Sequence, residues 1–185
     1  MSFFAKSAVV IAGAVALALA PAAAEASATV SITPPTVPAE LTIPEGHHVV
    51  SRYAADGVQV YECTTAGAWT LHAPVARLNN SDTRDVGKHF GGVDAGLPAG
   101  PYWESYRDHS RVHGGEAIRA AAPDPNAIPW LRLTALDTSG SGAFGAVTFI
   151  HRVDTTGGLA PAGTCDPGAV RAVPYTANYY FYERD

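Results

Sequence analysis

Four side chains that could bind a metal ion fall within 25 positions of one another: His89, Glu104, His109 and His113. Sets of histidine and glutamate can hold zinc or copper. On a strand, His109 and His113 would share a face but lie about 13 Å apart, too far to bind one ion together. On a helix they would meet, but Gly114 and Gly115 follow immediately and disfavour a helix. The second functional hypothesis is therefore a metal-dependent enzyme or metal carrier that binds zinc or copper through His89, Glu104 and one of His109 or His113. Ordinary surface and turn histidines are the alternative.

Aromatic residues lie beside these candidates. Tyr102, Trp103 and Tyr106 flank Glu104, and each aromatic type offers an apolar face, which suits sugar rings, small planar ligands or a protein partner. Core packing is the alternative role for such residues, and it is the one expected for Trp130 and Phe181. The first hypothesis is a binding site formed by His89, Tyr102, Trp103, Glu104 and Tyr106.

The sequence offers little support for a catalytic site. No serine stands in a Gly-x-Ser-x-Gly pattern. Residues 140–145 (GSGAFG) fit Gly-x-Gly-x-x-Gly, but a strand is expected to follow where dinucleotide binding needs a helix, so we interpret them as a hairpin turn. Glu62 and Glu104 could serve as paired carboxylates for sugar hydrolysis, although nothing in the sequence shows that they meet. The favoured function is a non-catalytic binding or surface-interaction module without a cofactor.

The elements that must position these residues are predicted to be short strands. Runs rich in Val, Tyr, Thr and Phe are separated by Gly, Pro, Asn and Asp, and helical periodicity is almost missing. Residues 79–100, polar and rich in glycine, are expected to form a long functional loop. The fold class is all-β, a single antiparallel β-sandwich or barrel-like domain, Greek-key or meander. Strands are expected at 48–53, 58–64, 68–72, 75–78, 116–120, 130–136, 146–153 and 178–183.

Two of these strands alternate in an informative way. In the run 58–63, Gln59, Tyr61 and Cys63 share one face. If Cys63 is bridged inside the domain, Tyr61 packs inward with it. The run 178–182 (NYYFY) places two aromatic side chains on each face, so one pair must face outward or line a groove.

Cys63 and Cys165 are the two cysteines of the chain. They form no Cys-x-x-Cys and no metal-ligand spacing, so a disulfide is the first interpretation in an oxidising compartment. Two free buried thiols are the alternative. A disulfide would link positions 102 residues apart and remove conformational entropy from the unfolded chain.

The N-terminal residues predict export. Lys6 precedes an apolar run at 8–20 and a string of small residues, so 1–26 is expected to be a signal peptide cleaved after 24, 26 or 28. A membrane anchor is the alternative, but the run is shorter than the roughly 18 to 20 residues that a spanning helix requires. The mature protein is expected to be extracellular or periplasmic without a membrane span. Residues 27–44 hold four prolines and predict an extended lead-in, and 45–185 are expected to form the single β domain.

Charge narrows the class of partner. The formal net charge is −5, and the few basic residues are scattered along the chain. Nucleic acid and anionic membrane surfaces attract clustered lysine and arginine, so neither is an expected partner. The expected partner is therefore a small molecule, a glycan or a surface protein.

Six segments of the chain form a recognisable set: GVQVYEC (57–63), HFGG (89–92), WE (103–104), IPWL (128–131), VDTTGG (153–158) and VPYTA (173–177). Together they resemble a family of secreted bacterial and fungal proteins catalogued as domain of unknown function 3455. The resemblance covers nearly the whole mature chain in the expected order and implies no established activity, substrate or cofactor. By placing Cys63 within the first segment, it makes the cysteine part of the domain. Asp108-His109-Ser110 stands where members often carry Asp-Gly-Ser, which weakens any shared role for His109.

Overall fold

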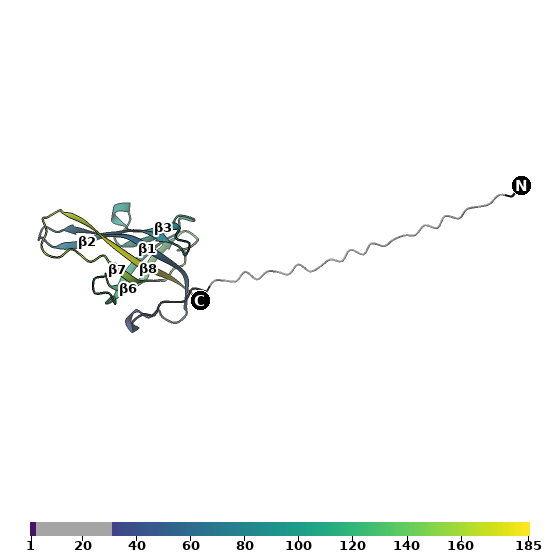
Figure 1. Ribbon diagram of the computed structural model, residues 1–185, viewed down its shortest axis with the longest axis horizontal. Helices are drawn as coiled ribbons and strands as arrows, with labels where there is room; N and C mark the ends of the chain where they lie inside the picture. Colours follow the sequence, from purple (N-terminus) through teal and green to yellow (C-terminus); the bar gives the residue numbers. More distant parts are fainter. Residues whose placement is uncertain (3–30) are drawn as a thin grey trace. The chain divides into compact units, whose positions relative to one another are not determined.

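Eight strands follow one another along residues 31–185 and form a single closed sheet, whose ribbon is drawn in Figure 1. Each strand pairs antiparallel with the next, and the last pairs back with the first, so the sheet closes as a barrel. This confirms the all-β class in its barrel-like, meander form. The strands are β1 (His47–Cys63), β2 (Trp69–Asn79), β3 (Asp85–Gly91), β4 (Pro101–Ser105), β5 (Arg111–Ala120), β6 (Trp130–Ser139), β7 (Phe149–Gly157) and β8 (Val170–Arg184).

The computed structural model describes residues 1–2 and 31–185. Apart from residues 1 and 2, the predicted signal peptide lies outside the described residues, as does the start of the lead-in. Two short 3-10 turns, η1 (Ala39–Leu41) and η2 (Val93–Ala95), are the helical elements of the described part. None of the helices found there is long and apolar enough to cross a membrane.

β1 and β2 are continuous where the sequence predicts two strands each. Gly57, which is typical of a turn, lies inside β1 opposite Ala76. A Cβ at Gly57 would stand 2.1 Å from the carbonyl oxygen of Val75, so glycine is needed for the close approach of the two strands. The expected face is nevertheless confirmed, because Gln59, Tyr61 and Cys63 are all buried.

The prediction of a long loop at 79–100 is wrong. β3 occupies 85–91, and only the connection from 92 to 100, which includes η2, joins β3 to β4. The inward positions of β3 are Gly87, His89 and Gly91, so the strand shows no alternation of apolar residues. A Cβ at Gly87 would lie 2.5 Å from the carbonyl oxygen of Glu104 on β4, which explains why glycine occurs within a strand here.

Residues 140–145 form the expected glycine-rich turn between two antiparallel strands, β6 and β7. Phe144 of this connection is 1% exposed and packs into the core at that end of the barrel, against Phe181 and Tyr53. The backbone N–H of Phe144 donates to Ser110 Oγ at 3.0 Å. Asp108 accepts hydrogen bonds from the Ser110 hydroxyl and from the backbone N–H groups of Ser110 and Ala143, and these bonds hold its pKa down at about 2.

The outward aromatic pair of β8 is Tyr180 and Tyr182, and it is covered rather than exposed. Residues of the lead-in, including Ile32, Val37 and Ile43, pack against this cluster. His151 of β7 fixes the arrangement, because its Nε2 donates to the carbonyl oxygen of Leu41 at 2.7 Å and its Nδ1 lies 3.0 Å from the Tyr182 hydroxyl. The described part of the lead-in therefore covers the outer face of β7 and β8.

A disulfide joins Cys63, at the end of β1, to Cys165 in the connection between β7 and β8. This confirms the predicted bond. The backbone N–H of Cys165 also donates to the carbonyl oxygen of Gly67 at 3.2 Å, and that of Gly168 donates to Cys63 at 2.9 Å. The bond and its neighbours tie the β1–β2 and β7–β8 connections together at one end of the barrel.

Replacing both cysteines by serine should lower the free energy of unfolding by about 2 to 5 kcal/mol, because the unfolded chain regains the freedom of a large loop. Urea unfolding of wild type and of Cys63→Ser/Cys165→Ser measures the difference. Wild-type protein kept reduced during unfolding is the matched control and should behave as the double variant does. Equal midpoints for oxidised wild type and the double variant would contradict this role of the bond.

His109 adopts a left-handed backbone conformation, with φ of 55°. Such a conformation is unfavourable for residues with a Cβ. His109→Gly should therefore raise the free energy of unfolding by about 0.5 to 1 kcal/mol, after allowance for the greater freedom of glycine in the unfolded chain. His109→Ala, which keeps the Cβ, is the control and should give no such gain in thermal or urea unfolding.

Candidate functional site

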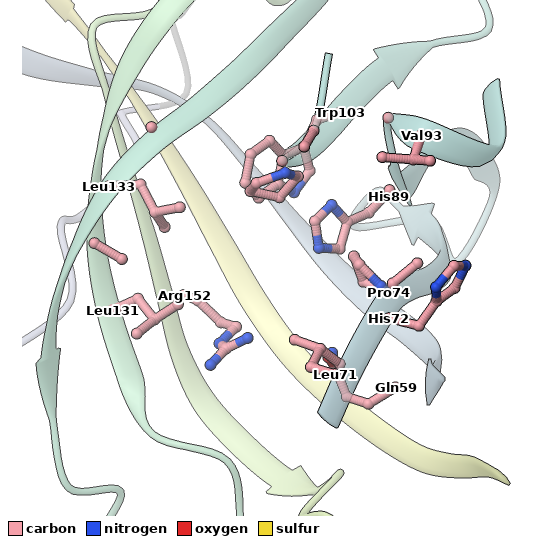
Figure 2. Close-up of a pocket in the computed structure, with 18 of the residues that line it drawn as sticks. Gln59, Leu71, His72, Pro74, His89, Val93, Trp103, Leu131, Leu133 and Arg152 are labelled. Carbon is pink, nitrogen blue, oxygen red and sulfur yellow. The ribbon is translucent and has the colours of Figure 1, made fainter. Parts of the chain in front are cut away.

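A cavity of about 300 Å³ lies inside the barrel, at the end where the disulfide-linked connections meet. All eight strands contribute to its lining. The walls are mainly apolar, with a few polar side chains among them (Figure 2). The lining side chains that matter below are Gln59 (β1), His89 (β3), Trp103 (β4), Ala117 (β5), Leu131 and Leu133 (β6), Arg152 (β7) and Tyr179 (β8).

One wall carries His89 and Trp103, which are directly paired between β3 and β4. Their rings stack with centroids 4.4 Å apart and planes 11° from parallel. His89 Nδ1 donates to the carbonyl oxygen of Tyr102 at 2.9 Å. Burial lowers the pKa of His89 to about 3, more than the Tyr102 carbonyl raises it. His89 is therefore neutral at pH 7, and its Nε2 is left as a hydrogen-bond acceptor.

Arg152 lies on the opposite wall, next to Leu131 and Leu133 (Figure 2). It is 9% exposed. Its Nε and Nη2 donate to the carbonyl oxygen of Pro129 at 3.3 and 2.9 Å, and its guanidinium also interacts with the Tyr179 hydroxyl. Within residues 1–2 and 31–185, no carboxylate lies within 4.0 Å of its guanidinium. A buried cation without a counter-ion is unusual, because buried charges are normally paired.

The charge of Arg152 acts on the other groups inside the barrel. It lowers the pKa values of Tyr175 and Tyr179, although burial raises both by more. It also adds to the lowering of the His89 pKa. The charge of Arg152 therefore reaches the titratable groups on the other walls of the cavity.

Two further polar groups lack partners. Gln59 is 1% exposed, and its Nε2 has no hydrogen-bond partner in the described part of the chain. The same holds for Nε1 of Trp103. Both side chains line the cavity. Buried donors of this kind are normally satisfied, so the cavity offers hydrogen-bonding capacity that the described protein atoms do not use.

The rim of the cavity is formed partly by the connection between β3 and β4. Its Asp94 accepts a hydrogen bond from His72 Nε2 of β2 at 2.9 Å. His72 Nδ1 also lies 3.6 Å from a carboxylate oxygen of Glu62. Val93 and Leu71, beside this contact, are 62% and 50% exposed. The rim thus combines exposed apolar side chains with a histidine that contacts two carboxylates.

The structure brings together only two of the five residues expected to form a binding site. His89 and Trp103 line the cavity. Glu104, next in sequence, lies on the outer face, 3.2 Å from Lys88 and 3.8 Å from Arg111. Tyr102 is also on the outer face, stacked on Phe90 and His113, and Tyr106 is in the connection between β4 and β5. Consecutive strand residues point to opposite faces, which separates neighbours in sequence.

The expected metal ligands do not converge either. His89 points into the barrel, whereas His113 lies on the outer face with Nδ1 3.2 Å from Asp137 and Nε2 bonded to the carbonyl of Ala99. His109 is in the β4–β5 connection. Over the residues whose placement is described, no group of three or more His, Cys, Asp or Glu side chains is positioned to hold a metal ion.

The carboxylates considered for sugar hydrolysis are also apart. Glu62 contacts His72 at the rim, and Glu104 contacts Lys88 and Arg111 on the outer face of β4. They do not face one another across the cavity.

Sequence reasoning missed Gln59 and Arg152 as cavity residues. A signal was present in both cases. Gln59 lies on the same face as Tyr61 and Cys63, and a polar residue on a buried face requires a partner. Arg152 belongs to the predicted strand sequence FIHRV (149–153). It is two residues after Ile150 and so lies on the same face of the strand, and a buried Ile150 would place Arg152 inward.

The fold and the cavity define a class of protein, a closed antiparallel eight-stranded barrel with an interior site at one end. Within that class, the chain belongs to a known family. Residues 44–183 match the family described as "Protein of unknown function (DUF3455)", which confirms the resemblance seen in the sequence. The chain matches no curated protein and no solved structure.

His89 should make stability depend on pH. The unfolded histidine binds a proton below about pH 6.5, whereas the folded one resists protonation down to about pH 3. The free energy of unfolding should therefore fall as pH decreases from about 6.5 to about 3, and be insensitive to His89 above that window. His89→Asn keeps a donor for the Tyr102 carbonyl but does not titrate, so its stability should fall less steeply.

Urea unfolding at a series of pH values compares these slopes. His109→Asn changes an exposed histidine and should keep the wild-type slope. Parallel curves for wild type and His89→Asn would contradict the neutral, buried state of His89.

Proposed function

We propose that the protein is a secreted, non-catalytic binding module that takes a small molecule into the barrel cavity. The observation that carries this proposal is the enclosed space of about 300 Å³ with apolar walls and a few converging polar groups, the usual character of a small-molecule site. His89, Arg152 and Gln59 provide an acceptor, a cation and an amide around one space. No paired acid and base or activated nucleophile accompanies them in the described part of the chain.

The burial of the aromatic residues favours a cavity ligand over a glycan or a surface protein. Glycan platforms need aromatic faces that are open to solvent. Tyr102 and Trp103 are 3% and 1% exposed, and Tyr106, at 45% exposed, stands apart from them in the β4–β5 connection. The polar and apolar groups that could recognise a ligand instead surround the interior space.

Export is part of the proposal. The disulfide between Cys63 and Cys165 supports an oxidising compartment, and the predicted signal peptide at 1–26 supports the same route. We propose that the mature protein acts outside the cytoplasm without a metal or other cofactor. Stoichiometric zinc or copper in protein purified from metal-replete medium would contradict the proposal that the protein acts without a metal.

Filling the cavity should weaken binding. Ala117 lines the cavity from β5, whereas its neighbour Ile118 is 39% exposed on the other face. A fragment collection containing neutral and charged compounds, screened by ligand-observed NMR, should give compounds that bind wild type. Ala117→Phe should weaken their binding by about tenfold or more, equal to about 1.4 kcal/mol, and the matched control Ile118→Phe should leave it unchanged.

Two results would contradict this function. One is the absence of any bound compound, neutral or charged, at millimolar concentration. The other is binding whose affinity Ala117→Phe leaves unchanged. Conversion of a bound compound to a product would contradict the non-catalytic role while leaving the site in place.

A further inference from the structure

The cavity contains a buried cation that the described part of the protein leaves without a counter-ion, and from this we propose that its ligand is a small monocarboxylic acid whose carboxylate pairs with Arg152. The proposal rests on the proposed function and narrows it to one chemical class. It depends on Arg152, on the unpartnered amide of Gln59 and on the neutral acceptor of His89.

Arg152 has donors to spare. A guanidinium carries five N–H groups and cannot lose its proton in a protein. The carbonyl of Pro129 takes one N–H from Nε and one from Nη2, and the guanidinium also interacts with the Tyr179 hydroxyl, whose pKa it lowers; the remaining N–H groups can serve another acceptor. The planar arrangement of such donors matches the two oxygens of a carboxylate.

Gln59 adds a second donor for the same anion. Its side chain is almost fully buried, lines the cavity, and its Nε2 is without a partner among the described residues. An amide N–H and a guanidinium beside one space together provide hydrogen bonds and charge for an oxyanion. A neutral ligand would leave the cation uncompensated, which is costly in a buried site.

The balance of charge favours a single carboxylate over a phosphate dianion. Arg152 is the one buried cation of the cavity lining. The other arginine, Arg119, is exposed at the rim, and the rim carboxylate Asp94 already pairs with His72. One buried positive charge is matched by one negative charge, and a second would remain unpaired in the interior.

His89 defines the other end of the ligand. In an eight-stranded barrel, β3 and β7 are four strands apart, so His89 and Arg152 face each other across the interior (Figure 2). With Nδ1 donating to Tyr102, His89 Nε2 accepts. The body of the ligand lies against Trp103, Leu131 and Leu133. The ligand therefore has an apolar body, a carboxylate towards Arg152 and a hydroxyl or N–H donor towards His89.

Acids and their uncharged amides test the proposal directly. The probes are 4-hydroxybenzoate, 4-hydroxyphenylacetate and hexanoate, each compared with its primary amide, together with inorganic phosphate. Calorimetric titration of the full mature protein at pH 7 should show binding of at least one acid, with its amide about 30-fold weaker or more, the usual effect of losing one partner of a buried charge pair. The hydroxy acids should bind more tightly than hexanoate, and phosphate should bind weakly.

Substitutions locate the effect. Arg152→Met should weaken acid binding by about 30-fold or more and remove the preference over the amide. Arg152→Lys should keep the preference at reduced affinity, because it keeps the charge but not the planar donors. The control Arg119→Gln, at the exposed rim, should change affinity by less than about threefold. If Arg152→Met does not fold, as judged by circular dichroism, the acid and amide comparison on wild type decides alone.

The outcomes separate this inference from the proposed function. Equal affinity for acids and amides, retention of the acid preference in Arg152→Met, or no binding by any of the three acids at millimolar concentration would overturn the monocarboxylate proposal. Neutral compounds that bind wild type and are excluded by Ala117→Phe would preserve the binding function in each of these cases. Tighter binding of phosphate than of every acid would overturn the inference that the ligand carries a single negative charge.

Discussion

The antiparallel pairing of β1 with β8 closes the sheet, and the other features of the molecule depend on that closure. The pairing runs from His47 opposite Arg184 to Glu62 opposite Val170, and closure leaves no strand with an open edge. The disulfide lies at the end of this seam, because Cys63 follows Glu62 and Cys165 precedes the start of β8. Closure also divides every strand into an inner and an outer face, and the inner face then encloses a volume that side chains either fill or leave open.

The sizes of the inward side chains decide where the barrel is filled. At one end, Phe144, Phe181 and Leu78 are buried together in the core. At the other end, small residues such as Gly91, Gly115 and Ala117 line the wall. A barrel of eight strands has just enough interior for side chains to fill it or for one small ligand. The cavity is thus a consequence of residue size along the barrel, together with the register shifts that interrupt the β5–β6 pairing beside Gly115 and Ala117.

The sequence alone predicts the fold class and the disulfide, and it predicts the buried face of β1 because Gln59, Tyr61 and Cys63 alternate. It does not reveal β3, because the inward positions there are glycine and histidine rather than apolar residues. The candidate site is foreseen in part. His89 and Trp103 meet because β3 pairs with β4, but grouping Trp103 with Glu104 ignored strand alternation. Arg152 could not be assigned to the same space, since β7 faces β3 only after the sheet has closed.

The contrast between two neighbours on β7 shows why the interior polar groups point to a ligand. His151 faces outward, and both of its ring nitrogens are bonded, to Leu41 and Tyr182. The lead-in covers it, so its burial is fully compensated within the protein. Arg152, the next residue, faces inward with one carbonyl as acceptor and no carboxylate within reach in the part of the chain that the structure describes. The same strand can therefore satisfy a buried polar group where the chain provides partners, and the missing partner of Arg152 is best supplied by an anion that enters the cavity.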